Sequence, residues 1–216
     1  MPRYPIVLFD LDGTLIDSVA LILGSFRHTE QVHAIPPKTD DEWLAGLGTT
    51  LRTQFAPYDG VYGTMEELIA TYRSYNLTHH DAMVTVYDGV VPMLRALHGG
   101  GHRLGLVTSK AHAGARRGLR LAGVEELFEV VVGADDVTQP KPHPEPVHTA
   151  LARHGATVAD AVFIGDSTHD MHSGRAAGVA TAAALWGPFD RAHLSASAPD
   201  HWLERPDDVL RLVELA

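Results

Sequence analysis

Two aspartates, Asp10 and Asp12, directly follow a short apolar run near the beginning of the chain. The run, residues 6–9 (IVLF), is typical of a central strand that is buried on both faces, and Gly13 after it permits a backbone conformation that other residues resist. Acids at the carboxyl end of a central parallel strand stand where open α/β sheets bind ligands. Crowded carboxylates repel one another unless a cation holds them, and hard oxygen ligands suit magnesium. The alternative interpretation is a simple acidic turn after a strand.

Polar side chains also follow the later predicted strands. Thr108 and Ser109 offer hydroxyls and a helix start that can hold phosphate oxygens, although such a pair is often only a helix cap. Lys141 stands between two prolines, which stiffen its backbone, whereas a surface lysine is ordinarily solvated. Asp166 and Asp170 are four residues apart at a helix start, so they can face the same side or simply cap that helix. Together these residues place acids, hydroxyls and one lysine at successive strand ends.

Strands alternate with helices over most of the chain. We predict strands at residues 6–9, 103–107, 128–132, 161–164 and 179–185, with a last helix near 207–215. This alternation predicts an α/β fold, a Rossmann-like doubly wound parallel sheet with helices on both faces.

Residues 17–82 read as helical, with no strand convincing enough to pair. They include two short helices within 40–55 and a helix from 65 to about 77 that follows a capping box at 64–67. We therefore expect an inserted helical cap domain at 17–82, which hangs over the mouth of a core domain formed by 1–16 and 83–216.

Composition excludes several classes of protein. The formal net charge of −10 argues against a nucleic-acid-binding or anionic-membrane-binding surface, so an anionic substrate would need a local cation. The absence of cysteine excludes disulfides, thiolate chemistry and zinc–thiolate sites. No apolar run reaches membrane-spanning length and the opening residues show no signal-peptide pattern, so we expect a cytoplasmic protein. No feature of the sequence indicates an oligomeric state.

In combination these features resemble the haloacid dehalogenase-like (HAD) superfamily, and the resemblance covers nearly the whole chain. Its four motifs match DLDGT at 10–14, Thr108, Lys141 and GDSTHD at 165–170. The position of the insertion resembles the helical cap of the phosphoglycolate-phosphatase-like branch.

The resemblance implies a phosphohydrolase that forms a covalent aspartyl-phosphate. In it Asp10 would be the nucleophile and Asp12 the general acid/base, with Thr108 and Lys141 holding the phosphoryl group. The implied ligands of a Mg²⁺ cofactor are Asp10, Asp166 and the carbonyl of Asp12, with Asp170 in support. Such chemistry suits a carboxylate nucleophile, because phosphoryl transfer needs mainly positioning and charge neutralisation.

The cap is expected to select the substrate. The polar candidates in the cap are Arg27, His28, Arg52, Arg73, His79 and His80. Of these we predict that Arg52, His79 and His80 bind substrate, together with Thr108, Ser109 and Lys141 of the core. The runs SFRHT (25–29), TYRSYNLTHHD (71–81) and DDVTQPKPHPEPV (135–147) resemble the PpaX-type inorganic pyrophosphatases of this branch.

That resemblance implies a small anionic phosphate substrate, with pyrophosphate ahead of phosphoglycolate or another small organic phosphate. A phosphomutase and a non-catalytic phosphate-binding regulator are the other interpretations. A site for a compact, highly charged substrate is expected to contain several cationic cap groups and few apolar ones.

Overall fold

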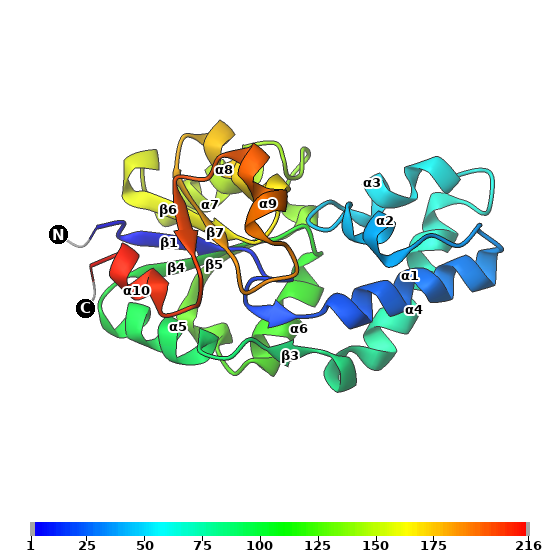
Figure 1. The fold of residues 1–216 in the computed structure, drawn as a ribbon, viewed down its shortest axis with the longest axis horizontal. Helices are drawn as coiled ribbons and strands as arrows, with labels where there is room; N and C mark the ends of the chain where they lie inside the picture. The colour runs from blue at the N-terminus through cyan, green and yellow to red at the C-terminus, as the bar shows by residue number, and fades with distance from the viewer. Residues whose placement is uncertain (1–2, 215–216) are drawn as a thin grey trace.

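The computed structural model describes residues 3–214 and contains a six-stranded parallel sheet (Figure 1). The strands, in spatial order, are β5 (Phe128–Val132), β4 (Arg103–Val107), β1 (Ile6–Phe9), β6 (Ala161–Gly165), β7 (Ala180–Ala184) and β8 (His201–Leu203). The chain runs outward from β1 through β4 to β5 and then returns to β6 on the other side of β1. The order therefore reverses beside β1, which is where doubly wound sheets bind their ligands. The predicted α/β class is confirmed.

Helices cover both faces of the sheet (Figure 1). One face carries α5 (Val90–Gly99), α6 (His112–Leu121) and α10 (Asp208–Leu212), and the other carries α7 (Glu145–His154) and α8 (Thr168–Ala177). The short α9 (Arg191–Leu194) lies between β7 and β8 in the chain. Since β1 is buried along its whole length, it is a central strand as its unbroken apolar run predicts.

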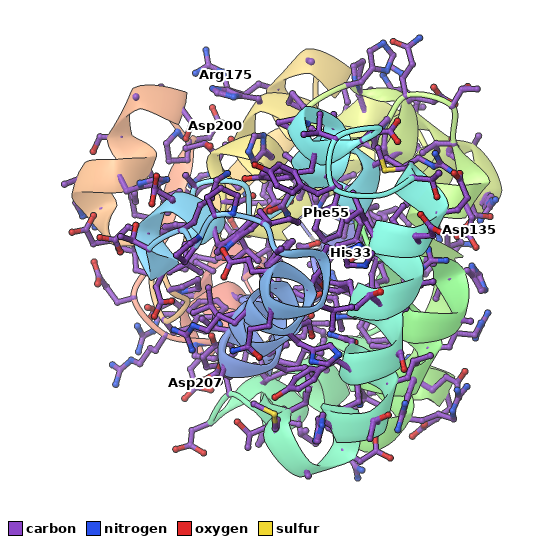
Figure 2. The ribbon with its side chains drawn as sticks, turned by 90° about the vertical axis from the view of Figure 1, so that its right-hand side faces the viewer. His33, Phe55, Asp135, Arg175, Asp200 and Asp207 are labelled. Carbon is purple, nitrogen blue, oxygen red and sulfur yellow. The ribbon has the colours of Figure 1, made fainter. Side chains whose placement is uncertain are left out.

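Four helices between β2 and β3 pack around an apolar cluster of their own, and we call residues 19–83 the cap. They are α1 (Val19–His33), α2 (Asp40–Leu44), α3 (Leu51–Phe55) and α4 (Met65–Met83). Phe26 of α1 stacks on Trp43 at 4.1 Å between ring centroids and meets Phe55 edge-on. Figure 2 looks onto this end of the molecule and shows α1 and α4 side by side, where His33 bonds Thr71 at 2.8 Å.

Several helix starts agree with the sequence. The predicted capping box at Thr64 and Glu67 is present, and the two short helices expected within 40–55 are α2 and α3. Helix α4, however, runs to Met83 rather than to about residue 77. The last helix, α10, begins within one residue of its predicted start but already ends at Leu212, and the expected end at residue 215 lies outside the described residues.

Three short strands were not predicted. β2 (Ile16–Asp17) pairs antiparallel with β3 (Thr85–Val86), so the two chain segments that link cap and core are joined to each other. β8 adds a sixth parallel strand at the edge. Strands of two or three residues are too short to show a hydrophobic period, which explains why the sequence pattern missed them. Within residues 3–214, no helix is both long and apolar enough to cross a membrane.

Candidate active site

The loop after β1 brings Asp10 to the carboxyl end of the sheet. Its N–H donates to the carbonyl of Ile164 at 2.9 Å, which continues the pairing of β1 with β6. Gly13 in this loop has φ +89°, and a Cβ on it would lie 2.3 Å from Oδ2 of Asp166. Thr14 donates its hydroxyl to Oδ1 of the same aspartate at 2.7 Å. Glycine is therefore required where the first and fourth loops touch.

Lys141 joins the loops that follow β1, β4, β5 and β6. Its ammonium group is buried and donates to Asp10 at 2.7 Å, to Asp170 at 2.6 Å and to the carbonyl of Val107 at 3.3 Å. Asp170 uses its other oxygen to accept from the N–H and hydroxyl of Ser167, as the acid of a capping box at the start of α8. Asp170 therefore caps the helix, as one of its two interpretations predicts, and it also pairs with Lys141.

Asp12 is paired with a lysine that the sequence analysis did not single out. Lys110 Nζ lies 2.6 and 2.9 Å from the two carboxylate oxygens of Asp12, and Ser18 donates its hydroxyl to one of them. Thr108 accepts from the N–H of Lys110 at 3.2 Å and does not cap α6, whose N-cap residue is Ala111. The signal for Lys110 was its place directly after the Thr-Ser pair.

The electrostatics of the four central groups follow from burial and pairing. Burial raises the pKa of Asp10 to about 7 against the lowering effect of Lys141, with Asp170 adding to the rise. Burial, then the nearby carboxylates of Asp170 and Asp10, raise the pKa of Asp166. Burial alone would raise the pKa of Asp12, but Lys110 and the hydroxyl of Ser18 together lower it. Burial alone would lower the pKa of Lys141, but its partners Asp10 and Asp170 raise it.

The site fits a hard divalent cation. One carboxylate oxygen from each of Asp10, Asp166 and Asp170 lies within 4.8 Å of the others. Oδ2 of Asp166 is buried and has no hydrogen-bond partner among the described residues. Four carboxylates, those of Asp12 included, stand against the two ammonium groups of Lys110 and Lys141, which leaves a formal excess of two negative charges. The carboxylate of Asp12 faces Lys110 and is not part of this cluster.

A cavity of about 320 Å³ lies between this site and the cap. Its core side includes Asp10, Asp12, Thr108, Ser109 and Lys110. Its cap side includes Ile22, Leu47, Gly48, Thr49, Leu51, Gln54, Tyr72, Arg73, Asn76 and Leu77. This cap wall is largely apolar with one cation, Arg73, so it does not show the several cationic groups expected for a compact charged substrate.

The three cap residues predicted to bind substrate do not line this cavity. Arg52 lines an adjoining second cavity of about 650 Å³, which shares Arg73 and Ser109 with the first, and it pairs with Glu66 at 2.8 Å. His79 lies against the ring of Tyr75, with centroids 4.3 Å apart, and the buried His80 bonds its exposed neighbour Asp81. Neither histidine is among the residues that line the two cavities.

The cap touches the core at a loop and also along α4, where Arg117 of α6 donates to Asp81 and to the carbonyl of Leu77. The hydroxyl of Ser109 donates to the carbonyl of Gly48 at 2.5 Å. Gly48 has φ +91°, and a Cβ on it would lie 2.6 Å from Oγ of Ser167. Ser109, predicted to bind substrate, therefore also holds the cap against the core, and the Gly46-Leu47-Gly48 sequence was the signal for a loop of this kind.

Comparisons with known proteins agree on a family. The sequence model of the haloacid dehalogenase-like hydrolases matches residues 7–184. Pyrophosphatase PpaX of Bacillus cereus is 40% identical over 207 residues, which cover 96% of this chain and 95% of the relative. A haloacid dehalogenase-like protein from Bacteroides fragilis has a solved structure with a TM-score of 0.88 and 28% identity, over 96% of this chain and 100% of the other. A Lactobacillus plantarum structure, whose name proposes a phosphoglycolate phosphatase, gives a TM-score of 0.86 and 26% identity over 97% and 99%.

Proposed function

Because this chain belongs to the haloacid dehalogenase-like hydrolases and is a phosphatase, we propose that it hydrolyses inorganic pyrophosphate through an aspartyl-phosphate, with Mg²⁺ as cofactor. The observation that carries the mechanism is the carboxylate of Asp10, held by buried Lys141 at the floor of the cavity. We also propose that residues 1–16 and 83–216 form the catalytic core domain and residues 17–82 the cap domain.

In the first step, Asp10 attacks one phosphorus of pyrophosphate. A bond forms between its carboxylate oxygen and that phosphorus, the bridging P–O bond breaks, and the electron pair leaves with the second phosphate. Lys141, which contacts Asp10, neutralises negative charge on the phosphoryl group that is transferred. Thr108, in the cavity wall, lies beside that phosphoryl group. The orientation of Asp10 is fixed beforehand by its contacts, which lowers the entropic part of the barrier.

In the second step, water attacks the phosphorus of the aspartyl-phosphate. Asp12 takes a proton from that water, the bond from phosphorus to Asp10 breaks, and phosphate is released with the free carboxylate restored. The pair with Lys110 favours the carboxylate form of Asp12, which this step requires. A departing phosphate also needs protonation less than a departing alkoxide does, because phosphate is a far weaker base.

The carboxylates of Asp10 and Asp166 are the ligands that would hold the cation. Asp170 supports them by pairing with Lys141 and by accepting from the N–H of Ser167 at the start of α8. A bound Mg²⁺ would supply charge stabilisation for the phosphoryl oxygens. The unpartnered oxygen of Asp166 supports this assignment, since a buried carboxylate oxygen without a donor is costly.

A small organic phosphate is the second candidate substrate, and one observation favours it. The cap wall presents Ile22, Leu47, Leu51 and Leu77, which could pack against an organic group but cannot bind a phosphate. Pyrophosphate is favoured over it because relatives at 39–40% identity are named pyrophosphatases.

The test is phosphate release in the presence of Mg²⁺, with kcat/KM compared for pyrophosphate, phosphoglycolate and a panel of sugar phosphates. We expect pyrophosphate to give the highest value. A higher value for an organic phosphate would establish the second candidate, and turnover that is insensitive to removal of divalent cations would contradict the proposed cofactor.

A further inference from the structure

We propose that Arg73 and Lys110 form a two-cation clamp that binds the phosphate which leaves in the first step, and that Arg73 is thereby the residue of the cap that selects a substrate with two anionic groups. This inference rests on the proposed function, because it assigns the second phosphate of pyrophosphate to a place in the cavity. The clamp is defined by the side chains of Arg73 on α4 and Lys110 after β4.

The two residues are the cationic side chains among the described residues that line the cavity above Asp10. Lys110 belongs to the core and Arg73 to the cap, so an anion between them would be held from both sides. Among the described residues, the rest of the cap wall has no other positive charge to offer a second phosphate. An anionic group that extends from Asp10 into the cavity can therefore find charge compensation only at these two side chains or at a bound cation.

Arg73 differs from the other arginines of the cap in its pairing. Arg27 pairs with Asp40 and Arg52 with Glu66, whereas no carboxylate among residues 3–214 lies within ion-pair distance of Arg73. An unpaired guanidinium at a cavity wall keeps its donors available, and its fork matches two oxygens of one phosphate.

Lys110 also has a donor to spare. An ammonium group has three N–H donors, and the two oxygens of Asp12 account for two of them. The third can bind an oxygen of the leaving phosphate, which places that phosphate beside the acid/base residue. The same contact would bring the bridging oxygen close to Asp12.

The experiment measures binding, so that it does not depend on which substrate is turned over. Titration calorimetry with saturating Mg²⁺ compares methylenediphosphonate, which carries two anionic groups, with methylphosphonate, which carries one. The proteins are the wild type, Arg73→Gln, Arg73→Lys and the matched control Arg27→Gln, which removes a cap arginine away from the cavity.

We expect Arg73→Gln to weaken methylenediphosphonate about tenfold or more, as loss of a charge-assisted hydrogen bond implies. Methylphosphonate should change less than about twofold, Arg73→Lys should restore part of the loss, and Arg27→Gln should change neither ligand. Equal weakening of both ligands by Arg73→Gln, or no change in either, would overturn the clamp.

The outcome is separable from that of the proposed function. If the wild type prefers an organic phosphate in the kinetic comparison but Arg73→Gln still loses only the diphosphonate, the clamp stands and the proposed substrate is wrong. If pyrophosphate is preferred and Arg73→Gln leaves both affinities unchanged, the substrate stands and the clamp is wrong.

Discussion

Lys141 is the residue that makes the crowded carboxylates compatible with a folded protein. Its buried ammonium pairs with Asp10 and Asp170 at the same time, and each of these bonds is 2.7 Å or shorter. Removing Lys141 would leave both buried carboxylates uncompensated, which is costly. The nucleophile is therefore held in place by the same contacts that stabilise the centre of the molecule.

Replacing Asp10 by Asn is expected to abolish turnover without unfolding the protein. The variant keeps the shape of the side chain and removes only the nucleophilic carboxylate, so kcat should fall by roughly 10⁴-fold or more while the thermal midpoint does not decrease. Steady-state kinetics and thermal unfolding check this. Asp88→Asn, at an exposed position, is the control and should behave as the wild type. Substantial turnover by well-folded Asp10→Asn would exclude the covalent mechanism.

The stability of the cation-free protein should depend on pH through Asp10 and Asp166. Their pKa values are raised, that of Asp10 to about 7, so the folded state holds protons that the unfolded state releases. This contribution is fully present below the unfolded pKa near 4 and is lost as the pH rises through about 7. Mg²⁺ binds the ionised carboxylates, so it should raise the thermal midpoint more at pH 8 than at pH 5.

Thermal scans of chelator-treated protein, with and without Mg²⁺, measure that difference. In Asp166→Asn, the stabilisation by Mg²⁺ should differ less between pH 8 and pH 5, because one of the two carboxyl groups with a raised pKa is gone. An equal effect of Mg²⁺ at both pH values in the wild type would contradict the assignment of these carboxylates to the cation.

At the scale of elements, the loop that contains Gly48 and the loop that follows β4 form one of the contacts that hold the cap against the core. The hydrogen bond from Ser109 to the carbonyl of Gly48 crosses between them, and the positive φ of Gly48 brings the backbone close to Ser167. This contact lies in the wall of the cavity itself, so closing of the cap and shaping of the substrate site are coupled there.

Ser109→Ala should weaken cap closure. Loss of a hydrogen bond between neutral groups costs about 1 kcal/mol, so KM is expected to rise by up to about fivefold while kcat stays within about twofold. The control is Ser195→Ala, whose hydroxyl donates to the carbonyl of Arg191 in α9, outside the cap. A large loss of kcat at unchanged KM would place Ser109 in the chemistry rather than in the closing of the cap.

The long elements could be predicted from the sequence, and the reason is periodicity. The five strands predicted from apolar runs all belong to the sheet, and the capping box at Thr64 marks the start of α4 within one residue. The two-residue strands β2 and β3 pair through backbone groups alone, which leaves no pattern of side chains to read. Tertiary pairing thus determines the short elements.

The site residues at the strand ends could also be predicted from the sequence, whereas the cap residues that line the cavity could not. The rule that ligands bind at the carboxyl edge of a parallel sheet anticipates that Asp10, Lys141 and Asp166 meet. Which side of α4 faces the cavity depends on how the cap packs on the core. Arg73 therefore lines the cavity, while His79 lies against Tyr75, although both are polar residues of one helix.

At the scale of the whole molecule, net charge opposes the approach of the substrate. A formal charge of −10 repels a phosphate-bearing anion until it reaches the local cations. With Mg²⁺ saturating and constant, kcat/KM should rise modestly, about two- to threefold, between roughly 10 and 150 mM potassium chloride as repulsion is screened. Potassium acetate at equal ionic strength is the control for inhibition by chloride. A steep fall with salt would show that the cations of the cavity dominate the field.

The pairing of Asp10 with Lys141 also has a consequence for the time course of synthesis. The two residues are 131 positions apart in the sequence, and Thr14 is 152 positions from its hydrogen-bond partner Asp166. At ribosomal speeds of 5–20 residues per second, the lysine emerges roughly 7 to 26 s after the nucleophile. During that interval the nascent chain presents an aspartate with no ammonium to orient it, so phosphatase activity can begin only after β6 and the start of α8 have joined the first strand.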